Sequence, residues 1–249
     1  MELTVLGCYG TFPGVDGACS GYLLQEDGFN LLLDCGNGTI GRLQRYVRIE
    51  DIDLIVLSHF HLDHIADAFT LKYALETKMA RGQRIGPKTL LCPSGPAELA
   101  GELLDGSVFN AVNIREREEY IYGNFKLSFV RTRHLIESYA VAVEQKGVKF
   151  VYSGDTGLCS GLAKASENAD LLLCESTLLE SEESGEAGHH LSAGAAGRIA
   201  AGANAARLML THFWYETDPK RYVDEASRYF ANVYAAEELS TYPIGPAPL

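Results

Sequence analysis

The chain has 249 residues, of which 47% are hydrophobic and 22% charged, a composition typical of globular proteins with a large buried core. This composition excludes a chain that is mainly disordered. The formal net charge of −12 excludes indiscriminate binding of polyanions over most of the surface, so any contact with nucleic acid has to be local.

The N-terminal segment, the apolar runs and the cysteines together favour a cytoplasmic location. Residues 1–7 pass from an acidic residue directly into a strand pattern, without the basic region and cleavage site of a secretory signal. The longest apolar runs have the length of strands and fall short of the roughly 20 residues that a membrane span requires. The six cysteines form no C-x-x-C pair, which favours reduced and mostly buried thiols.

Short apolar runs alternate with helical patterns along the chain. Ten runs, separated by glycine breaks, predict strands at Leu3–Gly7, Gly21–Gln25, Phe29–Asp34, Leu54–Ser58, Thr89–Cys92, Phe125–Val130, Tyr139–Val143, Phe150–Ser153, Leu171–Cys174 and Leu208–Thr211. Six patterns, each ended by Gly, Pro or polar residues, predict helices at Gly38–Val47, His64–Met79, Ala97–Leu104, Leu158–Asn168, Ser192–Ala203 and Asp218–Phe230. This order predicts a layered α/β protein with two sheets, and because no linker or change of composition divides the chain, we expect one domain over residues 1–249.

The most informative segment follows the predicted strand Leu54–Ser58. It places His59, His61, Asp63 and His64 within six positions, although the whole chain has only seven histidines, so a chance grouping is a poor explanation. In an extended segment residues two apart share a face, so His59 and His61 can bind one metal ion while Asp63 and His64, at the start of the next helix, reach a second. Imidazole and carboxylate ligands suit Zn²⁺, and they also admit Mn²⁺ or Fe²⁺.

Three further potential ligands, His134, Asp155 and His212, stand at the ends of predicted strands. The ends of strands are where α/β folds collect functional side chains. Each of the three is only suggestive by itself, because a single histidine at a strand end more often serves in a turn or a cap.

Together these residues resemble the metallo-β-lactamase superfamily, whose H-x-H-x-D-H signature corresponds here to His59, His61, Asp63 and His64, followed in the family's order by His134, Asp155 and His212. Gly7–Gly14 and Leu33–Thr39 look like two further segments of the family. The glycines of these segments permit tight turns, and Asp34 in the second segment is expected to support the metal loop from behind.

The resemblance implies an α/β fold of the αββα type, a four-layer sandwich, with two divalent metal ions at the edges of its sheets. It implies that His59, His61 and His134 bind one ion, that Asp63, His64 and His212 bind the other, and that Asp155 bridges them. A water held between two cations can ionise near neutral pH, and Asp63 is expected to orient it.

Three later stretches, Leu173–Thr177, His189–Ser192 and Leu210–Phe213, resemble the ribonuclease Z group and its small phosphodiesterase relatives. In that group a histidine, here His190, contacts the phosphate and a glutamate, here Glu175, orients it. The resemblance therefore implies catalytic roles for Asp63, His190 and Glu175, with His189 as a bystander. The alternative is that His190 only precedes the helix Ser192–Ala203 and that Glu175 is a solvated loop acid.

The segment between His134 and Asp155 departs from ribonuclease Z. Long-form members insert a flexible arm that grips tRNA there, whereas residues 135–154 suffice only for two strands and a turn. We therefore expect a metal-dependent hydrolase that acts as a phosphodiesterase on a small phosphodiester or a cyclic nucleotide through a metal-bridging hydroxide. tRNA 3′ processing is disfavoured. A lactonase or thioesterase with the same metals, and without an essential His190, is the alternative, whereas a non-catalytic binding protein would be expected to have lost ligands.

The expected partner is a small-molecule substrate, a phosphate ester, with no membrane and with nucleic acid only as a locally bound substrate. Relatives in this group are commonly homodimers that pack through helices near the first metal loop. Phe69, Leu71, Tyr73 and Leu75 supply more apolar residues than one buried stripe needs, although a helix facing the core gives nearly the same pattern. Trp214 and Tyr215 follow His212 and either line the mouth of the site or pack in the ordinary way.

Overall fold

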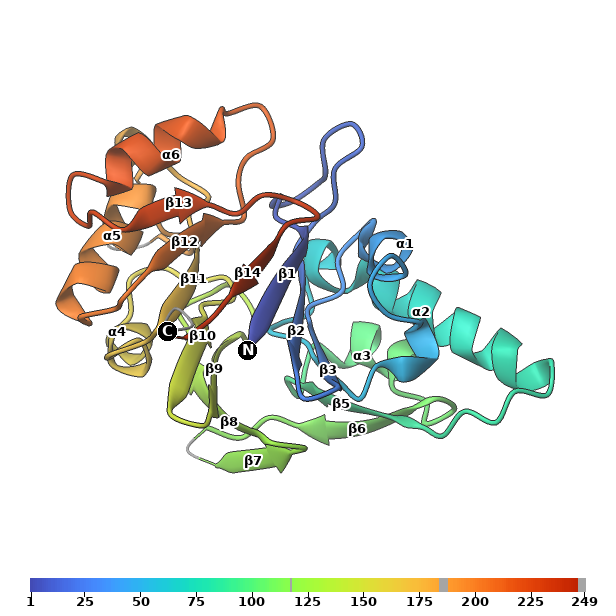
Figure 1. Cartoon of the computed structure of the whole chain (residues 1–249). Coiled ribbons are helices and arrows are strands. Elements are labelled where there is room, and N and C mark those ends of the chain that lie inside the picture. Colours follow the sequence, from blue (N-terminus) through green and yellow to red (C-terminus); the bar gives the residue numbers. More distant parts are fainter. Residues whose placement is uncertain (117, 184–187, 246–249) are drawn as a thin grey trace.

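Two seven-stranded sheets lie face to face in the computed structural model, and helices cover the outer face of each (Figure 1). The structure describes residues 1–116, 118–183 and 188–245. The first sheet has the order β14-β1-β2-β3-β4-β5-β6, with β14 (Thr241–Pro243), β1 (Glu2–Gly7), β2 (Gly21–Glu26), β3 (Phe29–Leu33), β4 (Leu54–Val56), β5 (Lys88–Cys92) and β6 (Phe109–Asn113). The second has the order β13-β12-β11-β10-β9-β8-β7, with β13 (Val233–Ala235), β12 (Leu208–Thr211), β11 (Leu171–Glu175), β10 (Val148–Tyr152), β9 (Tyr139–Gln145), β8 (Phe125–Arg131) and β7 (Glu119–Tyr122).

Each sheet is antiparallel in one half and parallel in the other. Strands β14 to β3 pair antiparallel and β3 to β6 pair parallel. In the second sheet β7 to β10 pair antiparallel and β10 to β13 pair parallel. Ligands in such folds bind beyond the carboxyl ends of the parallel strands. We therefore expect a ligand-binding site at the carboxyl ends of β4, β10, β11 and β12.

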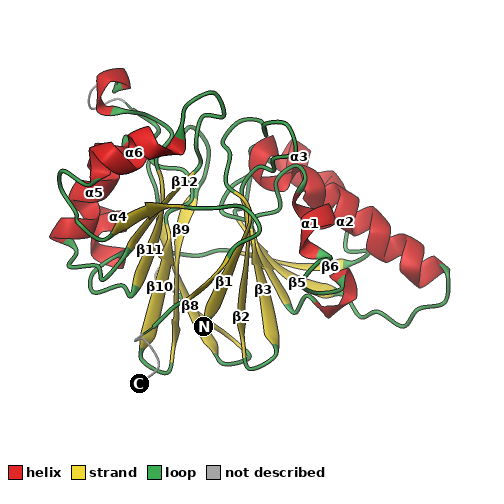
Figure 2. Ribbon diagram, turned by 45° about the horizontal axis from the view of Figure 1, so that its top comes forward, coloured by secondary structure: helices red, strands yellow, loops and turns green. Residues whose placement is uncertain are grey.

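Within the described part of the chain, six α-helices form the two outer layers (Figure 2). The first sheet is covered by α1 (Thr39–Leu43), α2 (Leu62–Ala80) and α3 (Ala97–Leu103), and the second by α4 (Ser160–Ala165), α5 (Ala193–Gly202) and α6 (Pro219–Ala226). Two short 3₁₀ helices, η1 (Ile49–Asp51) and η2 (Glu180–Glu182), complete the regular elements of the described ranges. This arrangement confirms the predicted αββα four-layer sandwich.

The central strands are apolar at nearly every position because both of their faces are buried. In β3, Leu31 and Leu33 belong to the core between the two sheets, whereas Leu32 belongs to the core beneath α1 and α2. Side chains alternate between the faces of a strand, so a strand with a layer on each side needs apolar residues throughout. The continuous apolar runs of the sequence are thereby explained.

The ten predicted strands and six predicted helices are all present, with shifted ends. The largest shifts are in α1 and α6, which end at Leu43 and Ala226 because the chain leaves each helix in turns. Four strands, β6, β7, β13 and β14, were not predicted, and they are the four edge strands of the two sheets. An edge strand is half exposed, so it lacks the continuous apolar run that marks a central one.

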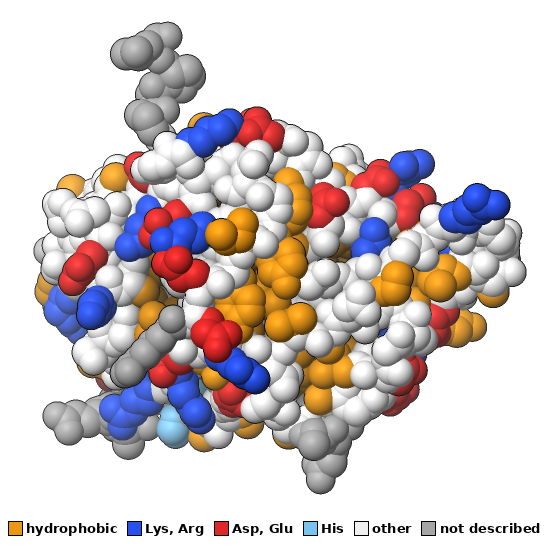
Figure 3. Space-filling view, turned by 90° about the horizontal axis from the view of Figure 1, so that it is seen from below, with side chains coloured by type: hydrophobic (Ala, Val, Ile, Leu, Met, Phe, Trp, Pro, Cys, Tyr) orange, Lys and Arg blue, Asp and Glu red, His pale blue; other side chains and the backbone are white. Residues whose placement is uncertain are grey.

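The helices and one face of the surface can be compared with the expected partners. No helix within residues 1–116, 118–183 and 188–245 is long and apolar enough to cross a lipid bilayer. On the lower face of the molecule, shown in Figure 3, Lys and Arg side chains lie among Asp and Glu side chains around a band of apolar ones. Positive charge on this face therefore occurs in small groups beside negative charge.

Two buried tyrosines link the sheets through hydrogen bonds. The hydroxyl of Tyr22 on β2 lies 2.7 Å from Thr211 Oγ1 on β12, and Tyr152 on β10 donates to Asp34 Oδ2, just beyond β3, at 2.7 Å. The centroids of the two rings are 5.1 Å apart. Burial raises the pKa of both tyrosines, so both hydroxyls keep their protons. The two bonds differ because Tyr152 bonds to a carboxylate, whereas Tyr22 bonds to the hydroxyl of a threonine.

This difference can be measured as a difference in stability. We expect Tyr152→Phe to lower the free energy of unfolding by about 2 kcal/mol, because a hydrogen bond to a charged group contributes about 1.5–3 kcal/mol. Tyr22→Phe is the matched control and should cost about 1 kcal/mol, the contribution of a neutral bond. Urea unfolding of the metal-free protein measures both. Equal losses would contradict a charged acceptor at Asp34.

Candidate metal centre

The segment between β4 and α2 carries four polar side chains past the end of the first sheet. Leu57 N donates to Leu91 O, which keeps the chain extended beyond β4. His59 and His61 follow in this extended segment, and α2 begins at Leu62, so Asp63 and His64 lie in its first turn. The spacing predicted two groups of side chains, and the structure places these four residues in two groups.

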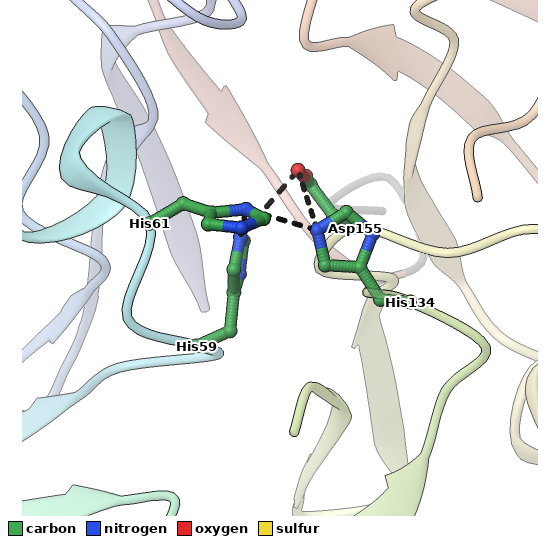
Figure 4. A group of neighbouring side chains, drawn as sticks. All are labelled: His59, His61, His134 and Asp155. Atoms are coloured by element: carbon green, nitrogen blue, oxygen red, sulfur yellow. Dashed lines mark hydrogen bonds and ion pairs between the residues drawn. The ribbon is translucent and has the colours of Figure 1, made fainter. Parts of the chain in front are cut away.

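The first group consists of His59, His61, His134 and Asp155. His61 Nδ1 lies 3.1 Å from His59 Nε2 and 3.0 Å from His134 Nε2. Asp155 Oδ2 lies 3.5 Å from His59 Nε2 and 3.8 Å from His134 Nε2. Figure 4 shows the four side chains pointing toward one another, with His59 and His61 on one loop and His134 and Asp155 on other segments of the chain. Residues from both sheets thus meet at one point.

The second group consists of Asp63, His64 and His212. His212 Nε2 lies 3.2 Å from both Asp63 Oδ2 and His64 Nε2. The other carboxylate oxygen of Asp155, Oδ1, lies 3.3 Å from His64 Nε2 and 3.4 Å from His212 Nε2. Each oxygen of Asp155 therefore faces one of the two groups, which is the arrangement expected of a bridging ligand.

The donor atoms fit a pair of divalent cations. Asp155 Oδ1 is buried and makes no hydrogen bond with any of the described residues, and a buried oxygen without a partner is costly unless a cation lies beside it. Ligand distances of about 2.0–2.1 Å in a tetrahedral zinc site place neighbouring ligand nitrogens about 3.3 Å apart. The ring nitrogens lie 3.0 to 3.2 Å from one another, close to that spacing. Histidine and aspartate donors suit Zn²⁺, Mn²⁺ or Fe²⁺.

The histidine rings are held from behind. Four of the five have an acceptor at Nδ1: Ser58 Oγ for His59 at 3.0 Å, Asp34 Oδ2 for His64 at 2.7 Å, the carbonyl of His189 for His134 at 3.0 Å, and Thr177 Oγ1 for His212 at 2.8 Å. An acceptor at Nδ1 keeps the proton there and leaves the Nε2 lone pair for a metal ion. The rings are therefore oriented for binding before any ion arrives.

Asp34 organises this support. Its Oδ1 accepts from Ser58 N at 2.6 Å, and its Oδ2 accepts from Ser58 Oγ at 2.8 Å, from His64 Nδ1 at 2.7 Å and from Tyr152 at 2.7 Å. The carboxylate is fully buried, and the residue has a φ of 54°, a conformation that residues other than glycine rarely adopt. Asp34 thus contacts the metal loop from behind, as the sequence led us to expect.

The surroundings hold several groups in their ligand forms. Burial and the neighbouring His64 lower the pKa of His59 well below its usual value, and burial also lowers the pKa of His61 and His134. Burial raises the pKa of Asp63, but His64 and His212 lower it by more, so the pKa of this carboxyl lies far below its usual range. Neutral imidazoles and an ionised carboxylate are the forms that bind a cation.

His190 and Glu175 form a pair beside both groups. His190 Nδ1 donates to Glu175 Oε1 at 3.0 Å. The His190 ring stacks on His212 at a centroid distance of 5.6 Å and stands edge-on to His134 at 5.1 Å. Burial lowers the pKa of His190, but the Glu175 carboxylate raises it by more, to about 9. His190 therefore carries a proton at neutral pH.

The surroundings of this pair bear on what the sequence predicted for these residues. Glu175 ends β11 and is buried, accepting from Thr156 N at 2.7 Å, so it is not a solvated loop acid. His189 has an exposed side chain, whereas His190 turns toward the centre. The sequence analysis missed Thr177, whose hydroxyl donates to Glu175 Oε2 at 2.7 Å and accepts from His212. Its position two residues after Glu175, on the same face of an extended segment, was the available signal.

Comparisons with known proteins agree with this geometry. Residues 29–213 match a family model described as a beta-lactamase superfamily domain. A Bacillus subtilis protein named "Probable metallo-hydrolase YhfI" is 34% identical over 214 residues, which cover 85% of this chain and 86% of that protein. The crystal structure of YhfI, described as a metallo-beta-lactamase fold protein, superposes with a TM-score of 0.92 over 97% of this chain and 98% of that one, at 30% identity.

Two more distant relatives are named as ribonuclease Z or tRNase Z. Ribonuclease Z of Ignicoccus hospitalis is 27% identical over 295 aligned positions, covering 96% of this chain and 97% of the relative. The short form of human tRNase Z superposes with a TM-score of 0.78 over 99% of this chain and 100% of that one, at 24% identity, a likeness that shows the fold.

The two groups predict the metal content of variants. We expect the protein dialysed against zinc to hold about two ions per chain, and His134→Ala and His212→Ala to hold about one each, because each variant loses a ligand of one group only. Elemental analysis after removal of free metal measures this. His189→Ala, which keeps the carbonyl that holds His134, is the control and should retain both ions. A wild-type content near zero would contradict the centre.

Proposed function

Because this chain belongs to the metallo-β-lactamase superfamily and is a metal-dependent hydrolase, we propose that it is a phosphodiesterase for a small phosphodiester or a cyclic nucleotide. The observation that carries the proposal is the His190–Glu175 pair beside the two ligand groups. A protonated imidazole next to a dinuclear centre suits an anionic substrate with a poor leaving group. A carboxylic ester or a lactone is uncharged, so it gains less from a cationic imidazole.

The roles of the residues follow from their positions. The two groups would hold divalent cations, whose charge would lower the pKa of a water from about 15.7 toward about 7 and would polarise a phosphoryl oxygen. Asp63 keeps its carboxylate ionised and orients the attacking water through a hydrogen bond. His190 donates a hydrogen bond to the phosphate, and it protonates the alkoxide as the bond to phosphorus breaks. Glu175 holds the His190 ring in place and stabilises its charge.

Three features of the chain favour a small substrate. Between His134 and Asp155 the chain forms the hairpin of β9 and β10, which leaves no inserted arm. The alignment with ribonuclease Z runs over 295 positions, more than the 249 residues of this chain, so that relative carries segments that this chain does not. A net charge of −12 also opposes a long polyanion. These facts favour a small phosphodiester over precursor tRNA.

The dependence on the leaving group tests the role of His190. We expect His190→Gln to lower kcat/KM for a cyclic nucleotide by about 10²-fold or more, because general acid catalysis contributes about 10²–10⁴-fold. The loss should be smaller for bis(p-nitrophenyl) phosphate, whose leaving group needs little protonation. His189→Gln is the matched control and should stay within about twofold of the wild type for both substrates. Unchanged turnover of the cyclic nucleotide by His190→Gln would contradict the proposal.

The same assay, extended to other substrates, separates the alternatives. Cleavage of lactones or thioesters without cleavage of any phosphodiester, and without an effect of His190→Gln, would replace the proposal by a carboxylic-ester hydrolase. Efficient removal of a tRNA 3′ trailer would reinstate the processing reaction.

We further propose that two copies of the chain pair through α2. Leu62, Phe69 and Tyr73 lie on one face of the helix, and Leu62 and Tyr73 are 62% and 73% exposed. Leu71 and Leu75, which the sequence analysis grouped with Phe69 and Tyr73, are instead buried against the first sheet. The apolar face that is left for a partner is therefore narrower than the sequence predicted.

A charge placed on this face should separate the copies. We expect Tyr73→Glu to shift a wild-type dimer to a monomer, because the introduced carboxylate would be buried without a partner in the interface. Chromatography with in-line light scattering measures the mass, and circular dichroism checks that the variant is folded. A wild type that is monomeric at every concentration would contradict the pairing.

A further inference from the structure

Three aromatic side chains stand together beside the candidate metal centre. Phe12 lies in the loop after β1, and Trp214 and Tyr215 closely follow the proposed ligand His212. The ring of Phe12 meets Trp214 edge to face at a centroid distance of 5.3 Å and Tyr215 at 6.2 Å. All three stay exposed, at 41%, 38% and 40%. We call Phe12, Trp214 and Tyr215 the aromatic corner.

The loop that carries Phe12 is held against the proposed metal ligands. Thr11 N donates to Asp63 Oδ2 at 2.6 Å, and Gly10 N donates to Phe213 O at 3.0 Å. Position 10 requires glycine because a Cβ there would collide with the imidazole of His212. The loops after β1 and β12 project from the same end of the sandwich in Figure 1. The aromatic corner is therefore fixed at the rim of the centre.

The charges of these loops limit what the corner can bind. Residues 10–17 and 213–217 contain no Lys or Arg, and their charged residues are Asp16 and Glu216. A phosphate group would be repelled there, whereas a flat uncharged ring would meet aromatic surfaces. Each of the three rings keeps exposed surface beyond these edge-to-face contacts, and bases stack on exposed aromatic faces whatever their sequence.

We propose that the aromatic corner binds the planar base of a nucleotide whose phosphate lies at His190 and the two ligand groups. The inference rests on the proposed phosphodiesterase function and narrows its substrate to phosphodiesters that carry a nucleobase. The corner supplies affinity for the base and takes no part in bond breaking.

Trp214 is the only tryptophan of the chain, so its fluorescence reports directly on the corner. The probes are adenosine 5′-monophosphate and ribose 5-phosphate, which carry the same phosphomonoester and differ by the base. We expect the first to quench Trp214 fluorescence, after correction for its absorbance, and to bind about tenfold more tightly than the second, the fold-change that corresponds to about 1.4 kcal/mol. Calorimetry on the metal-loaded protein measures both affinities.

Two variants with matched chemistry locate the effect. Phe12→Leu keeps an apolar side chain and the Trp214 signal but removes a flat face, and it should bring the ratio of the two affinities to about two or less. Tyr229→Leu is the control, because Tyr229 is equally exposed, at 41%, and its ring lies over Arg198, away from the corner. It should leave the ratio unchanged.

The outcomes separate this inference from the function on which it rests. Turnover of small phosphodiesters together with equal affinities for the two probes would overturn the base site and leave the phosphodiesterase standing. A ratio of the two affinities that stays near ten in Phe12→Leu would also overturn the base site. Base-selective binding without turnover of any phosphodiester would overturn the proposed reaction and leave the base site in place.

Discussion

The buried carboxylate of Asp34 is the contact on which the arrangement of the centre depends. It lies beyond β3 in the first sheet, yet it accepts hydrogen bonds from Ser58 and His64 on the metal loop and from Tyr152 in the second sheet. A buried charge is tolerated only when its hydrogen-bond partners are in place. The distance between the sheets and the orientation of the His64 ring are therefore set by the same carboxylate.

The centre consequently exists only where the two sheets meet. His59, His61, Asp63 and His64 come from the first half of the chain, and His134, Asp155 and His212 come from the second. Asp155 reaches both groups because its two oxygens face in different directions. His212 has a φ of 60°, a strained backbone conformation that turns its ring toward Asp63. The surrounding contacts hold the residue in this conformation. Neither half of the fold contains a complete set of donors for two ions.

The sequence predicted most of the fold and the whole set of candidate ligands, for reasons that can be named. Central strands are buried on both faces, so their apolar runs are visible, and His59 to His64 stand out because histidines are few. The four edge strands lack that signal. Thr177 and Tyr152 were missed as supports because a hydroxyl that holds a histidine or a carboxylate looks the same in sequence as any other. The excess of apolar residues on α2 was predicted, but its division between Leu71 in the core and Tyr73 in solvent depends on how the helix is rotated.

The pairing of β14 with β1 affects how the protein is made on the ribosome. Residues 241–243 complete the edge of the sheet that begins at residue 2, and Met1 O accepts from Ile244 N. At about 5–20 residues per second, roughly 10–50 s of translation separate the emergence of the two strands. During that interval the outer side of β1 is an unpaired strand edge, which nascent chains on neighbouring ribosomes can contact. Strand β1 therefore waits for a strand that is made much later, and a chaperone that covers its open edge meanwhile would favour correct folding.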